Sequence, residues 1–202
     1  MKKTVLCTLI LLFLFTAAGC KKEEFKISAE DNYTVNTIYA KADGKLQVAM
    51  VDAFDKPYYN LTELEEFAQN EINVYNKETS AERVKMDDIR LKSGNAVILL
   101  SFAGMNDYAN FNHALCAYFN GGVYDLSQNT MKLPDTLLDA KSKAATPIGD
   151  VLGNGKYKIL VMSEPYDIIV DGTVKYYSDN STLAEKNKVN AGEGMTVVVF
   201  KP

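Results

Sequence analysis

The chain has 202 residues, of which 47% are hydrophobic, 24% charged and 10% aromatic. This composition excludes a collagen, a low-complexity disordered chain and a disulfide-rich scaffold. The formal net charge is −4, and no basic cluster occurs beyond the pairs Lys2-Lys3 and Lys21-Lys22. The chain therefore lacks the electrostatic footprint of a nucleic-acid-binding protein, and it has no polybasic membrane patch.

The N-terminal segment has the layout of a secretory signal peptide. Lys2 and Lys3 form a short positive region, residues 4–19 carry no charge, and small residues precede Cys20. An uncharged run of this length is short for a membrane-spanning helix and typical of a cleaved signal. The sequence thus predicts that this protein is exported.

The motif Ala17-Ala18-Gly19-Cys20 resembles the lipobox of bacterial lipoproteins, with Ala17 where Leu is usual. The resemblance implies that Cys20 carries a diacylglycerol and becomes the N-terminus after cleavage. The alternative is an ordinary signal peptide in which the cysteine is incidental. Because each buried methylene contributes ~0.8 kcal/mol, two or three acyl chains would hold the protein on a membrane surface. We expect a lipid anchor at Cys20 and a location on the extracytoplasmic face of the cell membrane.

Removal of the signal changes the charge and the cysteine count. The mature chain carries 20 basic and 26 acidic residues, a net charge of −6. Cys7 leaves with the signal and Cys20 carries lipid, so Cys116 is the single unmodified thiol and no intramolecular disulfide can form. We expect a signal peptide, a lipidated flexible tether and one α+β extracytoplasmic domain at residues 1–19, 20–32 and 33–202.

Strand and helix patterns follow one another through the first half of this domain. Strands are predicted at residues 33–40 and 46–54, around a turn at Ala42-Asp43-Gly44. Asn60 and Glu63 then resemble a helix capping box. Apolar residues at helical spacing follow, on the face formed by Leu61, Leu64, Ala68, Ile72 and Tyr75.

A second hairpin and further strands complete the domain. The hairpin is predicted from residues 83–92 and 96–102 around Ser93-Gly94-Asn95. A short helix from Asn106 is expected to turn Tyr108, Phe111 and Leu115 inward and to stop at Gly121-Gly122, with another at residues 134–144. Strands are expected at residues 157–162, 167–170, 173–177 and 195–200, with a type I′ hairpin at Asp171-Gly172. These elements predict an α+β fold with a mostly antiparallel sheet and two to three helices.

Several short motifs resemble uncharacterised lipoproteins of Gram-positive gut anaerobes. They are Phe54-Asp55-Lys56, Tyr58-Tyr59, Leu64, Tyr75-Asn76, Asp107-Tyr108-Ala109, Phe111-Asn112 and Gly172–Ser178. The resemblance spans most of the mature chain and implies a location on the cell envelope. It implies no chemistry, because none is assigned to those proteins.

Candidate catalytic groups are few. If the helix from Asn106 continues, His113 and Cys116 lie at i and i+3 and form a possible nucleophile–base pair, against the simpler reading of a half-buried thiol. The glycines at 149–155 do not have phosphate-loop spacing. Carboxylates occur as Asp52 with Asp55, Asp87 with Asp88, and Glu164 with Asp167, and most are expected to be solvated. We assign no catalytic residue, no metal ligand and no cofactor.

The twelve tyrosines, in a chain without tryptophan, are the most distinctive side chains. If Tyr58-Tyr59 and Tyr176-Tyr177 are extended, each pair places one ring in the core and one on the surface. These exposed rings predict a platform for a glycan, peptide or protein partner, against the alternative of ordinary strand packing. We therefore favour a non-catalytic binding module over an extracytoplasmic hydrolase that uses a carboxylate pair or Cys116. A two-lobed solute-binding protein would need a longer chain.

Overall fold

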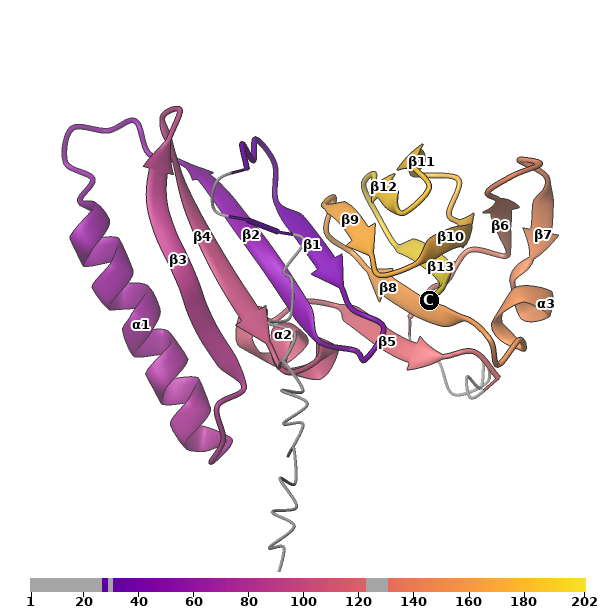
Figure 1. Ribbon diagram of the computed structural model, residues 1–202, viewed down its shortest axis with the longest axis horizontal. Helices are drawn as coiled ribbons and strands as arrows, with labels where there is room; N and C mark the ends of the chain where they lie inside the picture. The colour runs from indigo at the N-terminus through magenta and orange to yellow at the C-terminus, as the bar shows by residue number, and fades with distance from the viewer. Residues whose placement is uncertain (1–26, 29–30, 123–130) are drawn as a thin grey trace, which may run out of the picture.

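The computed structural model describes residues 27–28, 31–122 and 131–202. Within these residues the chain forms three helices and thirteen strands in two mostly antiparallel sheets (Figure 1). The expected α+β class is therefore confirmed.

Sheet A has seven strands in the order β11-β12-β9-β1-β2-β4-β3. Its strands are β1 (Thr37–Ala40), β2 (Leu46–Ala53), β3 (Val84–Lys92), β4 (Asn95–Phe102), β9 (Asp167–Val170), β11 (Thr182–Glu185) and β12 (Lys188–Asn190). The predicted hairpins β1–β2 and β3–β4 are both present, and Ser93 and Gly94 take the positive φ values (52° and 82°) of a type I′ turn. The first strand begins at Thr37, four residues later than expected, and β1 runs parallel to β9.

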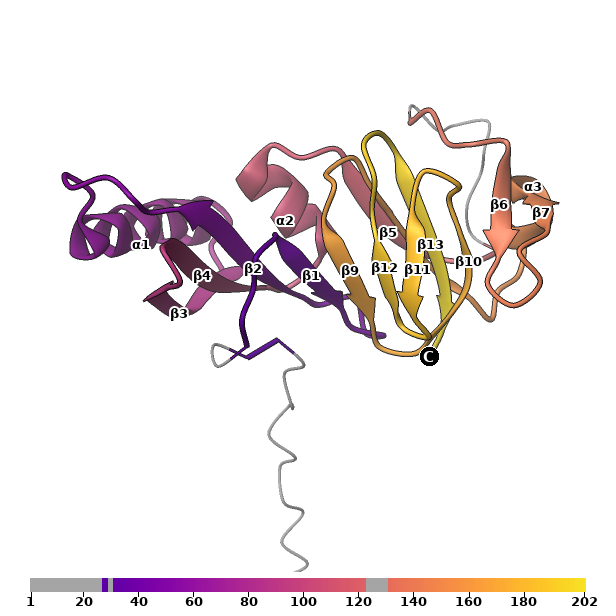
Figure 2. The ribbon, with the colours of Figure 1, turned by 90° about the horizontal axis from the view of Figure 1, so that it is seen from above.

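Sheet B has six strands in the order β5-β8-β13-β10-β6-β7. They are β5 (Cys116–Asn120), β6 (Thr136–Asp139), β7 (Ala145–Pro147), β8 (Lys158–Met162), β10 (Thr173–Tyr177) and β13 (Thr196–Lys201). Buried side chains of both sheets share one core, so the sheets pack face to face over part of their area. Figure 2 shows that β2, β4 and β3 extend beyond this contact, toward α1.

Three helices accompany the sheets: α1 (Leu61–Glu78), α2 (Met105–Asn112) and α3 (Ile148–Leu152). The predicted cap of α1 is confirmed, because the Asn60 side chain accepts hydrogen bonds from the backbone N–H groups of Thr62 and Glu63. α1 lies along β3, and its Ile72 is only 2% exposed within the same core that joins the two sheets. α1 therefore covers the same face of sheet A as sheet B does.

The opposite face of sheet A is covered by the beginning of the described chain. Ile27 is 2% exposed and packs in a cluster with Tyr39, Ala49 and Val97, with Tyr33 beside it. Ile27 falls within the segment expected to be a spacer, so the packed part of the chain reaches back at least to this residue.

Two expected helices are wrong in whole or in part. α2 ends at Asn112 because His113 adopts a left-handed conformation (φ 53°), and the following residues form β5, which pairs with β8. Leu115, expected inside, is consequently 51% exposed. The segment 134–144 is not helical but contains β6, which pairs with β7 and β10.

The strands flanking Asp171-Gly172 have the expected bounds but do not form a hairpin. β9 belongs to sheet A and β10 to sheet B, so the chain crosses from one sheet to the other at this turn. A Cβ atom on Gly172 would lie 2.3 Å from the carbonyl oxygen of Lys201, which explains the glycine. Local turn chemistry marks the bend correctly, but it does not determine which partner each strand chooses.

Candidate functional site

An apolar groove runs along α1 on the inner face of sheet A. Two adjoining cavities, of about 800 and 510 Å³, share Met50, Leu64 and Ile98 and therefore form one continuous depression. We call it the α1 groove. It is bounded by α1, by the ends of β2 and β4, and by the end of α2. Since α1 has 18 residues, it gives the groove a wall of about 27 Å at 1.5 Å per residue.

The floor of the groove is a part of the inner face of sheet A that is only partly covered. Met50 of β2 and Ile98 of β4 are opposite each other in the ladder, and both are half-buried. The next pair on the same face is Val48 and Leu100, and these two residues are buried, with exposed fractions of 0% and 3%. The apolar face is thus continuous along the strands, and Met50 and Ile98 are the places where it is less completely covered.

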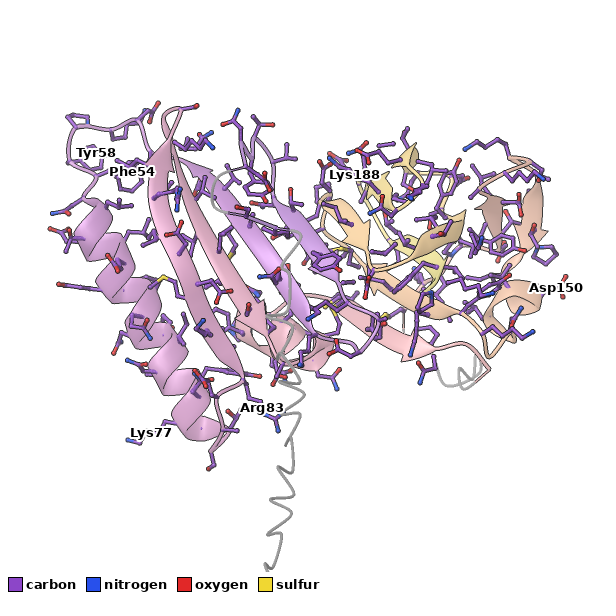
Figure 3. All side chains as sticks on the ribbon, viewed as in Figure 1. Phe54, Tyr58, Lys77, Arg83, Asp150 and Lys188 are labelled. Atoms are coloured by element: carbon purple, nitrogen blue, oxygen red, sulfur yellow. The ribbon has the colours of Figure 1, made fainter. Side chains whose placement is uncertain are left out.

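Three aromatic rings form one end of the groove, in the loop between β2 and α1. The ring centroids of Phe54 and Tyr59 are 4.9 Å apart, and those of Tyr58 and Tyr59 are 5.0 Å apart, edge to face. Tyr58 is 75% exposed and Tyr59 43% exposed. Figure 3 shows Phe54 and Tyr58 beside the start of α1, whereas Lys77 and Arg83 mark its other end.

The α1 wall of the groove alternates apolar and acidic side chains. Phe67, Glu71, Val74 and Glu78 all line the second cavity at i, i+4, i+7 and i+11. Phe67 is 64% exposed and Val74 46% exposed. Residues at these spacings form one stripe of a helix, so this stripe faces the groove beside the half-buried face that anchors α1 to the sheet.

α2 closes the far end of the groove. The Tyr75 hydroxyl donates a hydrogen bond of 3.2 Å to the Asp107 carboxylate, and the rings of Tyr75 and Phe111 meet edge to face at 5.6 Å. Burial, and then the Asp107 charge, raise the pKa of Tyr75, so the hydroxyl keeps the proton that it donates. These contacts fix α1 relative to α2 at this end of the groove.

The groove is acidic. Its described lining includes four carboxylates and the imidazole of His113 but no Lys or Arg: Asp52, Glu63, Glu71 and Glu78. α1 itself carries five Glu and one Lys. In the described part of the chain, neither Glu71 nor Glu78 makes a hydrogen bond or ion pair. A bound molecule therefore meets apolar surface flanked by negative charge.

The two predicted tyrosine pairs lie in different places. Tyr58 and Tyr59 sit in a turn rather than a strand, and both line the groove. Tyr176 and Tyr177 do lie on β10 with rings on opposite faces, but Tyr177 is 4% exposed in the main core. Tyr176 is half-buried, with its ring 6.0 Å from that of Tyr157. It packs on a second apolar cluster, which we call the outer cluster of sheet B: Leu137, Ile148, Val151, Leu152, Ile159, Val161, Val197 and Val199. The structure does not bring the two pairs together, and only the first lines the α1 groove.

The candidate dyad does not have the expected geometry. His113 is the residue that follows α2, and Cys116 begins β5, so the two residues do not share a helix face. Cys116 is 7% exposed, and burial together with Glu164 raises the pKa of its thiol to about 12. A nucleophilic cysteine needs the thiolate, which this environment disfavours.

The carboxylate pairs differ in their surroundings. Asp87 accepts a hydrogen bond from Ser101 and pairs with Lys85 at 2.8 Å, and Asp88 pairs with Arg90. Asp167 pairs with Lys188, and one oxygen of Glu164 is buried without a hydrogen-bond partner in the described chain. Among the carboxylates of the three predicted pairs, only Asp52 lines the α1 groove.

Of the exposed apolar residues of the groove, the sequence interpretation missed Phe67 and Val74. Both fall outside the apolar face predicted for α1, on the side that was expected to be polar. A pair of large apolar residues seven positions apart on a polar helix face is a recognisable pattern, because it predicts a second apolar stripe.

Comparisons of the chain with protein-family models, curated proteins and solved structures found no match. Cys20 lies outside the described residues. Among those residues, no helix is both long and apolar enough to cross a membrane. In the same part of the chain, no group of three His, Cys, Asp or Glu side chains is arranged to hold a metal ion.

Proposed function

We propose that this chain is a membrane-tethered extracytoplasmic binding module without catalytic activity, and that the α1 groove is its binding site. One observation carries the assignment of the site. Among the described residues seven large apolar side chains are exposed, and four of them gather on this groove: Tyr58, Tyr59, Phe67 and Val74. Clustered exposed apolar surface beside a concave floor is typical of interaction sites.

The course of the N-terminal segment supports the proposed arrangement. Ile27 packs on the outer face of sheet A, whereas the groove lies on its inner face. The described chain therefore begins on the face of sheet A opposite the groove. Neither Ile27 nor Ser28 lines the groove, so this part of the chain leaves the proposed binding site accessible.

Metabolic labelling with a palmitate analogue tests the anchor. We expect label on the full chain, and loss of label together with release from the membrane fraction in Cys20→Ala. Label retained in Cys20→Ala would contradict lipidation at this position.

Thermal-shift measurements on the full chain in lipid nanodiscs test the binding site, with cell-wall fragments, oligosaccharides and peptides as probes. A ligand at 100 times its Kd stabilises the folded state by about 2.7 kcal/mol. We expect one class to stabilise the protein and Phe67→Ser to abolish the effect. Leu91→Ser is a matched control, since Leu91 is 52% exposed but lies outside the groove. Equal loss in both variants, or none in either, would contradict the assignment.

A hydrolase that uses a carboxylate pair is the second candidate, because Asp52 and Glu63 line the same cavity. Their oxygens are held by different groups: Asp52 accepts from the Ala53 N–H, and Glu63 accepts from the Asn60 side-chain amide. Turnover of a chromogenic glycoside that disappears in Asp52→Asn, with groove binding intact, would favour this candidate over the binding module.

A further inference from the structure

We propose that the occupant of the α1 groove is a cationic amphipathic peptide segment of another protein, bound as a helix alongside α1. This inference rests on the proposed function, and it names the partner of the same site. It follows from the shape of the groove, the pattern of its wall and its charge.

The uncovered floor calls for an apolar partner. Met50 and Ile98 lie on the same face of β2 and β4 as the core residues. They are only half-buried, because α1 and sheet B do not meet above them. A sheet face of this kind is usually covered by a packed layer, and a helix is the common choice beside an existing helix. The wall of about 27 Å matches a helix of about 18 residues.

The α1 wall specifies the charge of that partner. Its apolar Phe67 and Val74 are separated and flanked by Glu71 and Glu78, with Glu63 one turn before Phe67. A peptide helix with Leu-like residues on one face and Lys or Arg along the borders of that face would match this wall. Its apolar residues would contact Phe67 and Val74, and its cationic residues would lie beside Glu71 and Glu78. Complementary charges of this type set specificity and orientation.

The same features disfavour a glycan. The tyrosines at one end could stack on a sugar ring, and Asp52, Asn60 and Glu63 beside them offer hydrogen-bonding groups. The floor along the rest of α1, however, consists of Met50, Ile98 and Leu100, which offer no hydrogen bonds to hydroxyl groups. Burying sugar hydroxyls without partners is unfavourable. The aromatic end therefore fits better as the anchor point for an apolar side chain of the peptide.

Two other occupants are also disfavoured. A second copy would place one acidic α1 groove, on a chain of net charge −4, against another. The chain's own N-terminal segment enters on the opposite face of sheet A, where Ile27 is packed. The charge of the groove thus favours a foreign, positively charged segment.

The test measures peptide affinity by fluorescence anisotropy, with the full chain in phosphatidylcholine nanodiscs and empty nanodiscs as the blank. The probes are three peptides of about 18 residues with Leu at i, i+3, i+4 and i+7 and either Lys, Gln or Glu elsewhere. We expect the Lys peptide to bind at least tenfold more tightly than the Gln peptide, and the Glu peptide to bind least. Raising the salt from 0.05 to 0.5 M should weaken the Lys peptide alone.

Charge reversal locates the interaction. Glu71→Lys/Glu78→Lys should weaken the Lys peptide at least tenfold and strengthen the Glu peptide. Glu65→Lys/Glu66→Lys is the matched control, because it makes the same charge change on the face of α1 that lines a separate shallow depression beside Met86. It should alter affinity less than threefold.

Three results would overturn the inference: equal effects of the two double variants, equal binding of the Lys and Gln peptides, or a dimer in sedimentation that Phe67→Ser dissociates. If no peptide binds but an oligosaccharide still gives a Phe67-dependent thermal shift, the partner class is wrong and the binding site stands. If no probe shows a Phe67-dependent effect, the proposed function fails as well.

Discussion

Burial decides the chemistry available to the single described thiol. Cys116 lies at the start of β5, inside the core between the two sheets, and Glu164 adds an unfavourable negative charge nearby. Both effects disfavour the thiolate, so the residue contributes packing rather than nucleophilicity.

The rate of alkylation at Cys116 follows from this environment. With a pKa of about 12, roughly one thiol in 10⁴ is ionised at pH 8, against about a quarter for an ordinary cysteine. We expect iodoacetamide to modify native Cys116 at least about 10³-fold more slowly than a free cysteine, as followed by mass spectrometry of the Cys116 peptide.

A matched exposed thiol controls for reagent and conditions. Leu115 is the neighbouring residue and is 51% exposed, so Leu115→Cys in a Cys116→Ala background should react at an ordinary rate. Native Cys116 reacting within tenfold of this control would contradict its burial and would support the hydrolase that uses Cys116.

At the scale of the element, α1 has two apolar stripes with different roles. Ile72 anchors the helix in the core, whereas Val74 faces the groove. Only the first of these stripes contributes to the free energy of folding, because the second remains exposed in the free protein.

Truncation of each stripe should therefore have a different effect on stability. Ile72→Ala should lower the free energy of unfolding by about 2–5 kcal/mol, since it removes buried methyl groups and leaves a cavity. Val74→Ala should change it by less than about 0.5 kcal/mol, because Val74 is 46% exposed and Ala is the better helix former. Urea denaturation followed by circular dichroism measures both, and equal losses would show that Val74 belongs to the core.

The success of sequence-based prediction also differs between elements. α1 was predictable because Asn60, Glu63 and a 3.6-residue apolar period act within one segment. The helix expected to run through Cys116 was not, because its end depends on the left-handed conformation of His113 and on pairing between β5 and β8. Similarly, Asp171-Gly172 marks a turn, but long-range pairing sends β9 and β10 into different sheets.

At the scale of the whole molecule, the groove exists because sheet A is larger than the layer that covers it. Sheet B and α2 cover one part, and α1 covers the edge at β3, which leaves Met50 and Ile98 between them. No local pattern contains this arrangement. The sequence predicted Tyr58 and Tyr59 as binding residues. It did not predict the groove floor beside them, because β2 and β4 form that floor only when they pair in the folded chain.

The central claim, that a cationic amphipathic helix occupies the α1 groove, is tested most directly by methyl NMR. In the full chain labelled at Met and Ile methyl groups, titration with the Lys–Leu peptide should shift Met50 and Ile98. Met195 and Ile148 pack in the outer cluster of sheet B and should not move. Shifts at Met195 and Ile148, with Met50 and Ile98 unchanged, would contradict the account.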